Sequence, residues 1–335
     1  MVSKAQILLQ RSFPTTRKAA ASKKDSADYS AEGIPPANVF HLELFNHFIS
    51  DLCLSFGFHR IAQMNSALEM TGSILSAQYL VNEIMAFSAL HLSIIRPEKK
   101  DFYHDQAAQL QTYALTAFNS TGVELTTDSC LPMFLFSSIL AMHMLCDKLV
   151  FRPDTFDQFL DDFIQSLRLH RGIRVVTSRS WQILLESPLG PVLEGESKAL
   201  DAGAQGNECS DLLALVDSMT ADPSTKDIYR QTIEHLQRAI NAGRVPSSTL
   251  DAIGPIVSWP VIIPPQYVDL LAERRPETLA ILAYFAALLH IHHKMWTFAD
   301  SGRYIVLSVN EHLGPSWERW LRWPNETIQN VQDSC

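Results

Sequence analysis

Apolar residues recur at helical spacing along almost the whole chain from residue 39 onward. In the first such segment, Leu42, Phe45, Phe48, Ile49 and Leu52 fall at i, i+3, i+6, i+7 and i+10, as on one face of an amphipathic helix. Further helices are expected over roughly 101–119, 131–150, 154–171, 208–219, 225–242, 276–298 and 302–322. Period-two runs bounded by Gly and Asn turns, which would indicate strands, are almost lacking. The pattern predicts an all-α fold, with a single large multi-helix domain.

The chain divides into a basic start, one helical body and a short end. The start is rich in Ser, Ala and Lys and closes with Gly33-Ile34-Pro35-Pro36, which is typical of a flexible arm. Inside the body, a stretch with three glycines indicates a mobile loop. The predicted segments are a flexible basic arm over 1–37, an all-α domain over 38–326 with the mobile loop at about 194–207, and a tail over 327–335.

Two uncharged apolar runs raise the question of a membrane span. Ser129–Cys146 has 18 residues and is borderline in length, while Leu279–Ile291 has 13 and is too short. The longer run contains Pro132 and His143 and has no aromatic or basic girdle. Since buried helices of large all-α domains are apolar on every side, we expect two core helices and no membrane span.

The charge distribution argues against nucleic-acid binding by this chain. Apolar residues make up 47% of the chain and charged residues 19%, as in a globular protein. Residues 1–24 carry six cations and no acid. The 21 other cations face 36 acids, so residues 25–335 have a formal charge of −15. A body this acidic repels phosphate backbones, and we expect no direct contact with nucleic acid.

The basic arm leaves the localisation open. Arg17-Lys18 and Lys23-Lys24 suit a weak nuclear-import signal. An acid-free start with Arg and Ser is also found in mitochondrial presequences, and a plain solvated tail explains the same composition. We therefore expect a nuclear or cytoplasmic protein, with mitochondrial import as a further possibility.

The cysteines do not form a zinc cluster. Five of them are scattered without a close pair, whereas a cluster that binds two zinc ions needs six thiolates in two tight groups. The odd number, without a secretory signal, favours free thiols in a reducing compartment. These residues are Cys53, Cys130, Cys146, Cys209 and Cys335.

An acidic helix offers a candidate metal site. Asp157 and Asp161 stand at i, i+4, so that their carboxylates could share one Mg²⁺ ion. Helical periodicity, however, places them opposite the apolar side formed by Phe156, Leu160, Phe163 and Leu167. Asp154 suits the N-cap of this helix, and Gly172 suits its C-terminal end. A capped, solvated helix face is the favoured interpretation, and the metal site is kept as an alternative.

Histidines and tryptophans gather near the C-terminus. His290, His292 and His293 lack the i, i+4 spacing of zinc ligands on one helix, and His292 is expected to be a core histidine with a backbone partner. The remaining histidines follow no ligand spacing, and no nucleophile elbow or phosphate-binding glycine loop occurs. We therefore assign no catalytic residue and no cofactor. Trp296, Trp317 and Trp320 are candidates for lining an apolar pocket, although core packing is the favoured interpretation.

Several landmarks together resemble a known family. They are Leu42–Phe48, Ile84–Leu92, Arg171-Gly172, Trp259-Pro260, Leu270-Leu271 with Arg275-Pro276, 281–290 (ILAYFAALLH) and Trp317–Pro324. In this order they resemble the C-terminal regulatory domain of fungal binuclear zinc-cluster transcription factors, in the branch of the sterol-uptake regulators. The segment Met295–Arg303 departs from the family, which usually shows paired tryptophans and a G-W-G-R run there.

The resemblance implies an all-α regulatory domain that binds a sterol- or terpenoid-like apolar molecule and acts through protein partners or as a homodimer. It suggests a transcriptional regulator or co-regulator, in secondary metabolism among other settings, without its zinc-cluster DNA-binding module. Two alternatives remain. One is a biosynthetic enzyme, a Mg²⁺-dependent terpene-cyclase-like protein (or a polyketide cyclase) in which Asp157 and Asp161 hold the metal. The other is a truncated gene model, in which an upstream exon encodes the missing zinc module.

Overall fold

The described part of the chain is built from helices. The computed structural model describes residues 37–53, 67–122, 126–201, 206–243 and 253–330. Within these ranges no strand occurs, which confirms the predicted all-α fold. Of the predicted N-terminal arm, residues 1–36 lie outside the described residues.

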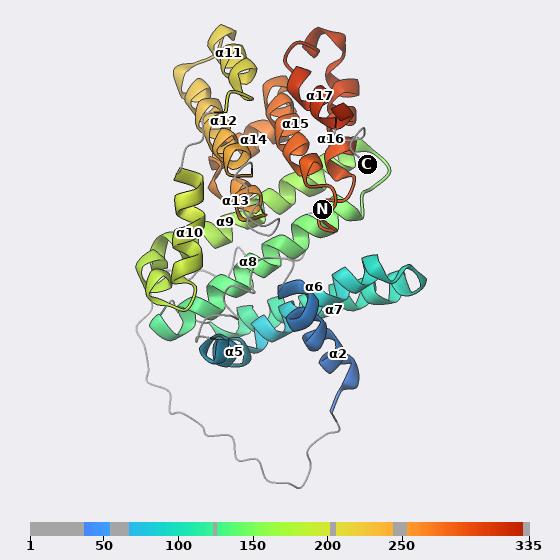
Figure 1. The fold of residues 1–335 in the computed structure, drawn as a ribbon, viewed down its shortest axis with the longest axis vertical. Coiled ribbons are helices and arrows are strands. Elements are labelled where there is room, and N and C mark those ends of the chain that lie inside the picture. The colour runs from blue at the N-terminus through green and yellow to red at the C-terminus, as the bar shows by residue number, and fades with distance from the viewer. Residues whose placement is uncertain (1–36, 54–66, 123–125, 202–205, 244–252, 331–335) are drawn as a thin grey trace.

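The longest helices follow one another between residues 100 and 186 (Figure 1). The first half comprises α2 (Val39–His47), the π-helical turn η1 (Phe48–Leu52), α5 (Ala67–Leu75), α6 (Gln78–Ile95), the 3-10 turn η2 (Pro97–Lys99), α7 (Lys100–Thr121), α8 (Thr127–Val150) and α9 (Phe156–Glu186). The second half comprises α10 (Gly190–Asp201), α11 (Ser210–Ser218), α12 (Pro223–Gly243), α13 (Ile253–Ile262), α14 (Pro265–Ala272), α15 (Pro276–Ile291), α16 (Ser301–Leu313), the 3-10 turn η3 (Pro315–Trp317) and α17 (Arg322–Asn330).

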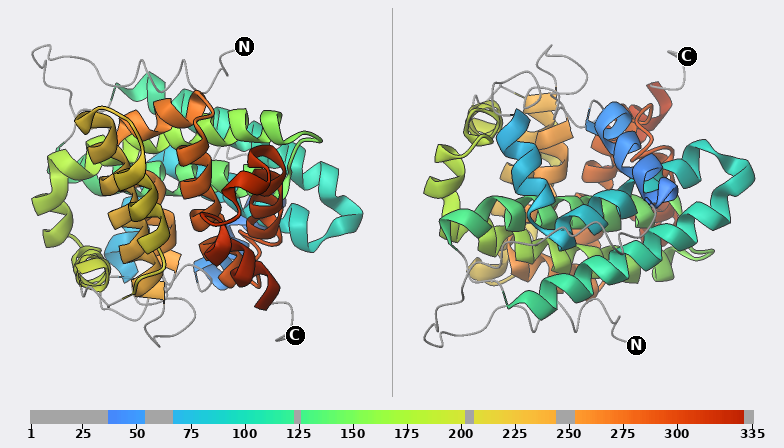
Figure 2. Two further views of the ribbon diagram at one scale, coloured as in Figure 1. Left: turned by 90° about the horizontal axis from the view of Figure 1, so that it is seen from above. Right: turned by 90° about the horizontal axis from the view of Figure 1, so that it is seen from below.

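Two apolar cores meet at α8. The N-terminal core, around Phe87 and Phe136, is formed by α2, α5, α6, α7 and α8. The C-terminal core, around Trp259, is formed by α9 and the helices from α11 to α17, and α8 adds Leu145 and Leu149 to it. In Figure 1, α8 and α9 cross the middle of the molecule, with α6 and α7 below them and α11–α17 above. The two views of Figure 2 show the same arrangement from the two ends.

The two apolar runs form core helices, as predicted. By length and composition α8 could cross a membrane, but 67% of its most apolar window is buried inside this fold, as in the core helix of a folded domain. The shorter α15 is buried from Thr278 to His290. The N-terminus of α8 is closed by a capping box, in which Thr126 Oγ1 accepts from the Ser129 N–H and Ser129 Oγ accepts from the Thr126 N–H.

Helix α9 is longer than predicted. It continues through Gly172 to Glu186, and its N-cap is Thr155 rather than Asp154, because Thr155 Oγ1 accepts from the Gln158 N–H at 3.3 Å. A glycine inside a helix costs only about 1 kcal/mol relative to alanine. Burial of Leu184 beyond the glycine outweighs that cost. The predicted helix end at residue 171 was therefore wrong.

The mobile loop predicted over 194–207 was also wrong in its first half. Residues up to Asp201 belong to α10, while 202–205 lie outside the described residues. Glu194 and Lys198 form an i, i+4 ion pair of 3.2 Å on this helix, and Val192 and Leu193 pack against the N-terminal core. Side-chain packing and helix propensity outweigh the single Gly195.

The C-terminal boundaries differ from the prediction for a local reason. The helix expected over 302–322 stops at Leu313, because Gly314 adopts φ +72° and Pro315 follows. The chain then forms α17, whose Ile328 is buried in the C-terminal core. Residues 327–330 therefore belong to the domain and not to a tail.

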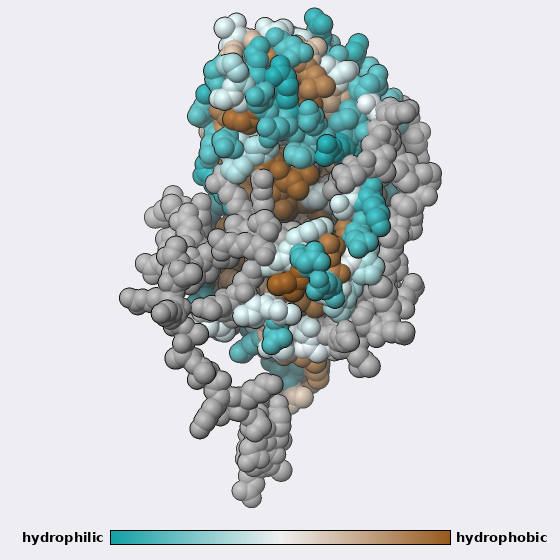
Figure 3. Space-filling model, turned by 90° about the vertical axis from the view of Figure 1, so that its left-hand side faces the viewer, coloured by the Kyte–Doolittle hydropathy of each residue, from teal (hydrophilic) through white to brown (hydrophobic). Residues whose placement is uncertain are grey.

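The first amphipathic face is rotated relative to the prediction. Leu44, Phe48 and Leu52, spaced by four, are fully or almost fully buried, whereas Leu42 is 58% and Ile49 48% exposed. From Phe48 to Leu52 the π-helical turn η1 widens the helix, which agrees with the spacing of four between the buried residues Phe48 and Leu52. On the side of the molecule shown in Figure 3, the surface over the upper helices is mostly hydrophilic, and apolar groups gather nearer the middle.

Trp259 allows a test of the C-terminal core. Its ring is fully buried and stacks on Phe285 at 4.3 Å between ring centroids, and its Nε1–H donates to the Thr232 carbonyl. We expect Trp259→Ala to lower the free energy of unfolding by about 3–5 kcal/mol. Trp181→Ala, at a surface-exposed position of α9, serves as the matched control and should cost much less. Equal losses in urea denaturation would contradict this description of the core.

Candidate ligand-binding pocket

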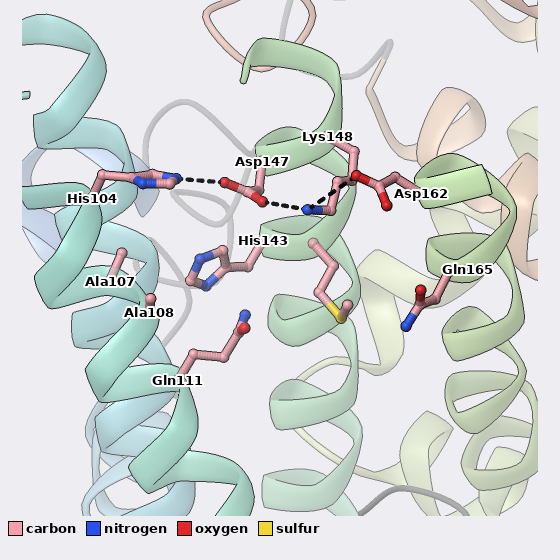
Figure 4. Close-up of a pocket in the computed structure, with 10 residues that line it drawn as sticks. His104, Ala107, Ala108, Gln111, His143, Asp147, Lys148, Asp162 and Gln165 are labelled. Carbon is pink, nitrogen blue, oxygen red and sulfur yellow. Dashed lines mark hydrogen bonds and ion pairs between the residues drawn. The ribbon is translucent and has the colours of Figure 1, made fainter. Parts of the chain in front are cut away.

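A cavity of about 250 Å³ lies where α7, α8 and α9 meet (Figure 4). Each helix contributes side chains at helical spacing, so that one face of each helix turns toward the cavity. The lining residues are His104, Ala107, Ala108 and Gln111 from α7, His143, Met144, Asp147 and Lys148 from α8, and Asp162 and Gln165 from α9.

One wall is a chain of charged groups that joins the three helices. His104 Nε2 lies 2.8 Å from Asp147 Oδ1, and Lys148 Nζ lies 3.1 Å from Asp147 Oδ2. Lys148 Nζ also approaches Asp162 Oδ2 of α9 at 3.8 Å. The chain therefore connects α7 to α8 and α8 to α9 (Figure 4).

Asp147 is the ionised centre of this wall. Burial opposes its ionisation, but the hydrogen bond from His104 and the positive charge of Lys148 outweigh burial and hold its pKa at about 2. The same hydrogen bond raises the pKa of His104. Because an ionised carboxylate can only accept, His104 Nε2 must carry the hydrogen of the shared bond.

A second polar part of the lining is a buried pair between α6 and α8. Glu83 is fully buried, and its Oε1 lies 3.0 Å from Nδ1 of the pocket residue His143, which is itself 4% exposed. Burial raises the pKa of Glu83, and the bond to His143 only partly offsets this effect. The Gln111 amide also faces the Glu83 carboxylate and lowers its pKa, although within the described residues Glu83 Oε2 and Gln111 Nε2 do not reach full hydrogen-bond geometry.

The buried pair joins α6 to α8. Burial favours the states in which Glu83 and His143 together carry no net charge. Which atom donates in the bond between Glu83 Oε1 and His143 Nδ1 depends on the tautomer of the imidazole.

The structure does not bring the predicted acidic pair toward this pocket. Asp157 and Asp161 are exposed on α9, on the side away from its buried residues, as the periodicity predicted. Asp161 Oδ1 pairs with Arg274 at 2.7 Å, and the same guanidinium reaches the Asp157 carbonyl. Their neighbour Asp162 lines the cavity instead.

The tryptophan candidates belong to two different clusters. Trp296 packs against the N-terminal core, where its ring lies 4.5 Å from that of His91 and 5.5 Å from that of Phe87. Trp317 and Trp320 pack against the C-terminal core. A joint apolar pocket between the three stays a prediction.

The C-terminal histidines are arranged differently from the expectation. The histidine with a backbone partner is His293, whose Nδ1 lies 3.0 Å from the His290 carbonyl, while His292 Nε2 is buried and has no partner among the described residues. No group of three or more His, Cys, Asp or Glu residues is placed to hold a metal ion in the part of the chain that the structure describes.

The spacing of histidines along the sequence did not indicate the two pocket histidines. His104 and His143 follow no ligand spacing because their partners lie on other helices, at separations of 43 and 60 residues. One feature of the sequence does indicate the α7 side of the pocket. His104, Ala107, Ala108 and Gln111 stand at i, i+3, i+4 and i+7, a small and polar face on a helix.

A second buried histidine pair ties the N-terminal helix to the fold. His47 Nε2 and His91 Nδ1 lie 2.9 Å apart, and His47 Nδ1 pairs with Asp51 at 3.0 Å. The His91 ring also lies against Trp296 in the turn after α15. Burial lowers the pKa of His47 and lowers that of His91 to about 4, so both are neutral at pH 7.

Comparison with known proteins confirms the predicted resemblance. A Zn(2)-C6 fungal-type transcription factor of Gibberella zeae is 24% identical to this chain over 259 residues. The match covers 73% of this chain and 52% of that protein, so the chain spans about half the length of the curated relative it matches. No protein-family model matches the chain, and no solved structure matches it significantly.

The Glu83–His143 pair makes a prediction for stability. We expect Glu83→Leu to lower the free energy of unfolding by about 3–5 kcal/mol, because it leaves His143 without its buried partner. In the double variant Glu83→Leu/His143→Leu the loss should be much smaller, since a buried pair is replaced by apolar groups. Denaturation of the wild type, both single variants and the double variant measures the coupling. Additive losses would show that the pair is not coupled.

His91 makes a prediction for pH dependence. Its pKa is about 4 in the folded protein and about 6.5 when unfolded, so the unfolded chain binds the extra proton between these values. The free energy of unfolding should therefore fall as the pH drops from 7 to 4, by up to roughly 3 kcal/mol from this group. His91→Asn should flatten that slope, whereas the control His312→Asn, at an exposed position, should not. Equal slopes in both variants would contradict the assignment.

Proposed function

We propose that this chain is the regulatory region of a fungal transcriptional regulator. The observation that carries the proposal is the similarity to the Zn(2)-C6 transcription factor over 259 residues, which spans most of this chain. The all-α architecture agrees with the fold that the resemblance implied. A nuclear location follows from the same proposal.

The charge of the chain supports action through protein partners rather than through DNA contacts of its own. Residues 25–335 carry a formal charge of −15, which disfavours approach to phosphate. The cysteines of the described residues are isolated free thiols, three of them buried: Cys130, Cys146 and Cys209. A protein partner, a second copy of the chain or a segment with its own DNA-binding module would supply the contact to a promoter.

Ligand sensing is the finer part of the proposal. An apolar, sterol- or terpenoid-like ligand and a role in secondary metabolism remain predictions from the resemblance. The cavity between α7, α8 and α9 gives the apolar ligand no specific support, because seven of its ten lining residues have polar or charged side chains. Its volume of about 250 Å³ is also below the range of about 300–1,000 Å³ that is usual for drug-sized ligands.

The alternative of a Mg²⁺-dependent cyclase gains no support from the geometry of Asp157 and Asp161. Asp161 is neutralised by Arg274, and both carboxylates are exposed on the outer side of α9. A cyclase would need these groups to face an apolar cavity that excludes water. The regulator is therefore the function that we propose.

A tethering experiment tests the regulatory role. The full chain is fused to an unrelated DNA-binding domain in yeast, and a reporter downstream of the cognate site is measured. We expect a several-fold change in reporter expression and nuclear accumulation of the tagged chain. The fusion carrying Trp259→Ala, which disrupts the C-terminal core, is the control and should lose the effect.

Gene deletion in the organism that encodes the chain provides the second measurement. Transcript levels of a defined set of genes should change, and biosynthetic clusters among them would support the role in secondary metabolism. A folded fusion without reporter activity, together with unchanged transcripts after deletion, would refute the proposed function.

A further inference from the structure

The outer face of the first helix carries apolar side chains that the cores do not use. Val39, Leu42 and Ile49 are 76%, 58% and 48% exposed, whereas Leu44 and Phe48, on the opposite side, are buried in the N-terminal core. Single exposed apolar residues are common in folded proteins, but a group of them on one helix face marks an interaction surface. In Figure 1, α2 lies at the lower edge of the fold, and the right-hand view of Figure 2 shows it on the face turned to the viewer.

The exposed residues of this face follow the spacing of a coiled-coil seam. Val39, Leu42, Asn46 and Ile49 stand at i, i+3, i+7 and i+10, which are the a, d, a and d positions of two heptads, and all four are exposed. We call these four residues the α2 seam. Ile49 is the second residue of η1, so the wider π-helical turn comes mainly after the seam. The spacing therefore indicates what covers this face, namely a second helix with a seam of its own.

The asparagine in the seam selects a second copy of this chain as the partner. A single Asn at an a position fixes the register of a helix pair at a cost in stability, because its amide needs a matching polar group. When two copies of α2 lie parallel, their Asn46 side chains face each other, and each amide can donate to and accept from the other. In an antiparallel pair Asn46 would face Leu42 and leave a buried amide unsatisfied, which is costly. The parallel arrangement therefore satisfies every position of the seam.

We propose that two copies of this chain associate through the α2 seam as a short parallel helix pair, with the two Asn46 side chains bonded to each other. Each helix is already held in its own fold by Leu44 and Phe48, so association does not include the cost of helix nucleation. The seam is only about 15 Å long. Such a small interface gives a weak dimer, which forms at about 10–100 µM protein and dissociates on dilution.

The charges of the chain oppose association at long range but not at the seam. Residues 25–335 carry a formal charge of −15, so two copies repel each other, and salt screens this repulsion. Beside the seam, Glu43 is paired with Arg96 of its own chain at 2.6 Å, and the flanking residues Phe45 and Ser50 are uncharged. We therefore expect added salt to strengthen the dimer. The inference names a partner that the proposed function leaves open, but it is measured on the isolated chain, so failure of one proposal leaves the other standing.

Sedimentation equilibrium of the full chain tests the surface. We expect the wild type to show a reversible equilibrium between monomer and dimer at about 10–100 µM. Leu42→Glu places a charge in the seam and should weaken the dimer at least about tenfold. Leu307→Glu, at an exposed apolar position of α16, is the matched control and should associate as the wild type does. Circular dichroism and urea denaturation check that both variants are folded.

A charge-pair experiment tests the parallel register. Asn46→Asp and Asn46→Lys each place like charges opposite one another in a parallel pair, so each variant alone should stay monomeric at concentrations where the wild type dimerises. When the two variants are mixed, they should form a heterodimer with one copy of each, because opposite charges then meet. The same two substitutions at Gln109, an exposed position of α7, are the control and should leave the association of the wild type unchanged.

The proposal is overturned by any one of three results. The first is a folded wild type that stays monomeric up to about 1 mM, well above the range expected for this interface. The second is equal association of Leu42→Glu and Leu307→Glu, which would place the contact between copies elsewhere on the surface. The third is the absence of a heterodimer in the mixture of Asn46→Asp and Asn46→Lys, which would show that the two copies do not meet at residue 46.

Discussion

The burial of α8 is the constraint on which the arrangement of the other helices depends. This helix is apolar along most of its length, and its side chains enter both cores of the molecule. A helix that exposes such a surface on more than one side must be covered on each of them. Helix α6 packs on one side of α8, with α7 packed against α6, and α9 packs on another side, with the C-terminal helices stacked beyond it (Figure 1).

The same constraint explains why polar chemistry is concentrated at the C-terminal half of α8. His143, Asp147 and Lys148 stand on a helix that has no free access to water on most of its surface. Unpaired polar groups in such surroundings are costly, so each is matched by a partner on a neighbouring helix. Glu83 of α6, His104 of α7 and Asp162 of α9 are these partners. The pocket is where this pairing leaves space between the helices.

Local patterns predicted elements better than boundaries. The buried sides of α9 and the apolar runs in α8 and α15 followed from periodicity alone. The C-terminal end of α9 and the extent of α10 did not follow from periodicity. Burial of Leu184 and packing of Val192 compensate for Gly172 and Gly195, which had suggested a helix end and a loop. The π-helical turn η1 from Phe48 onward was likewise not predicted, and no feature of the local pattern announces such a turn.

The sequence by itself determined the helical class, the exclusion of Asp157 and Asp161 from the buried side of α9 and the resemblance to a fungal regulator, because these depend on spacing and order along the chain. Only the tertiary structure decided the pocket. Tests of ligand spacing within one helix dismissed His104 and His143, whose partners are 43 and 60 residues away. Such pairs form because separate helices pack to bury apolar surface, and the polar groups that this packing brings together must then satisfy one another.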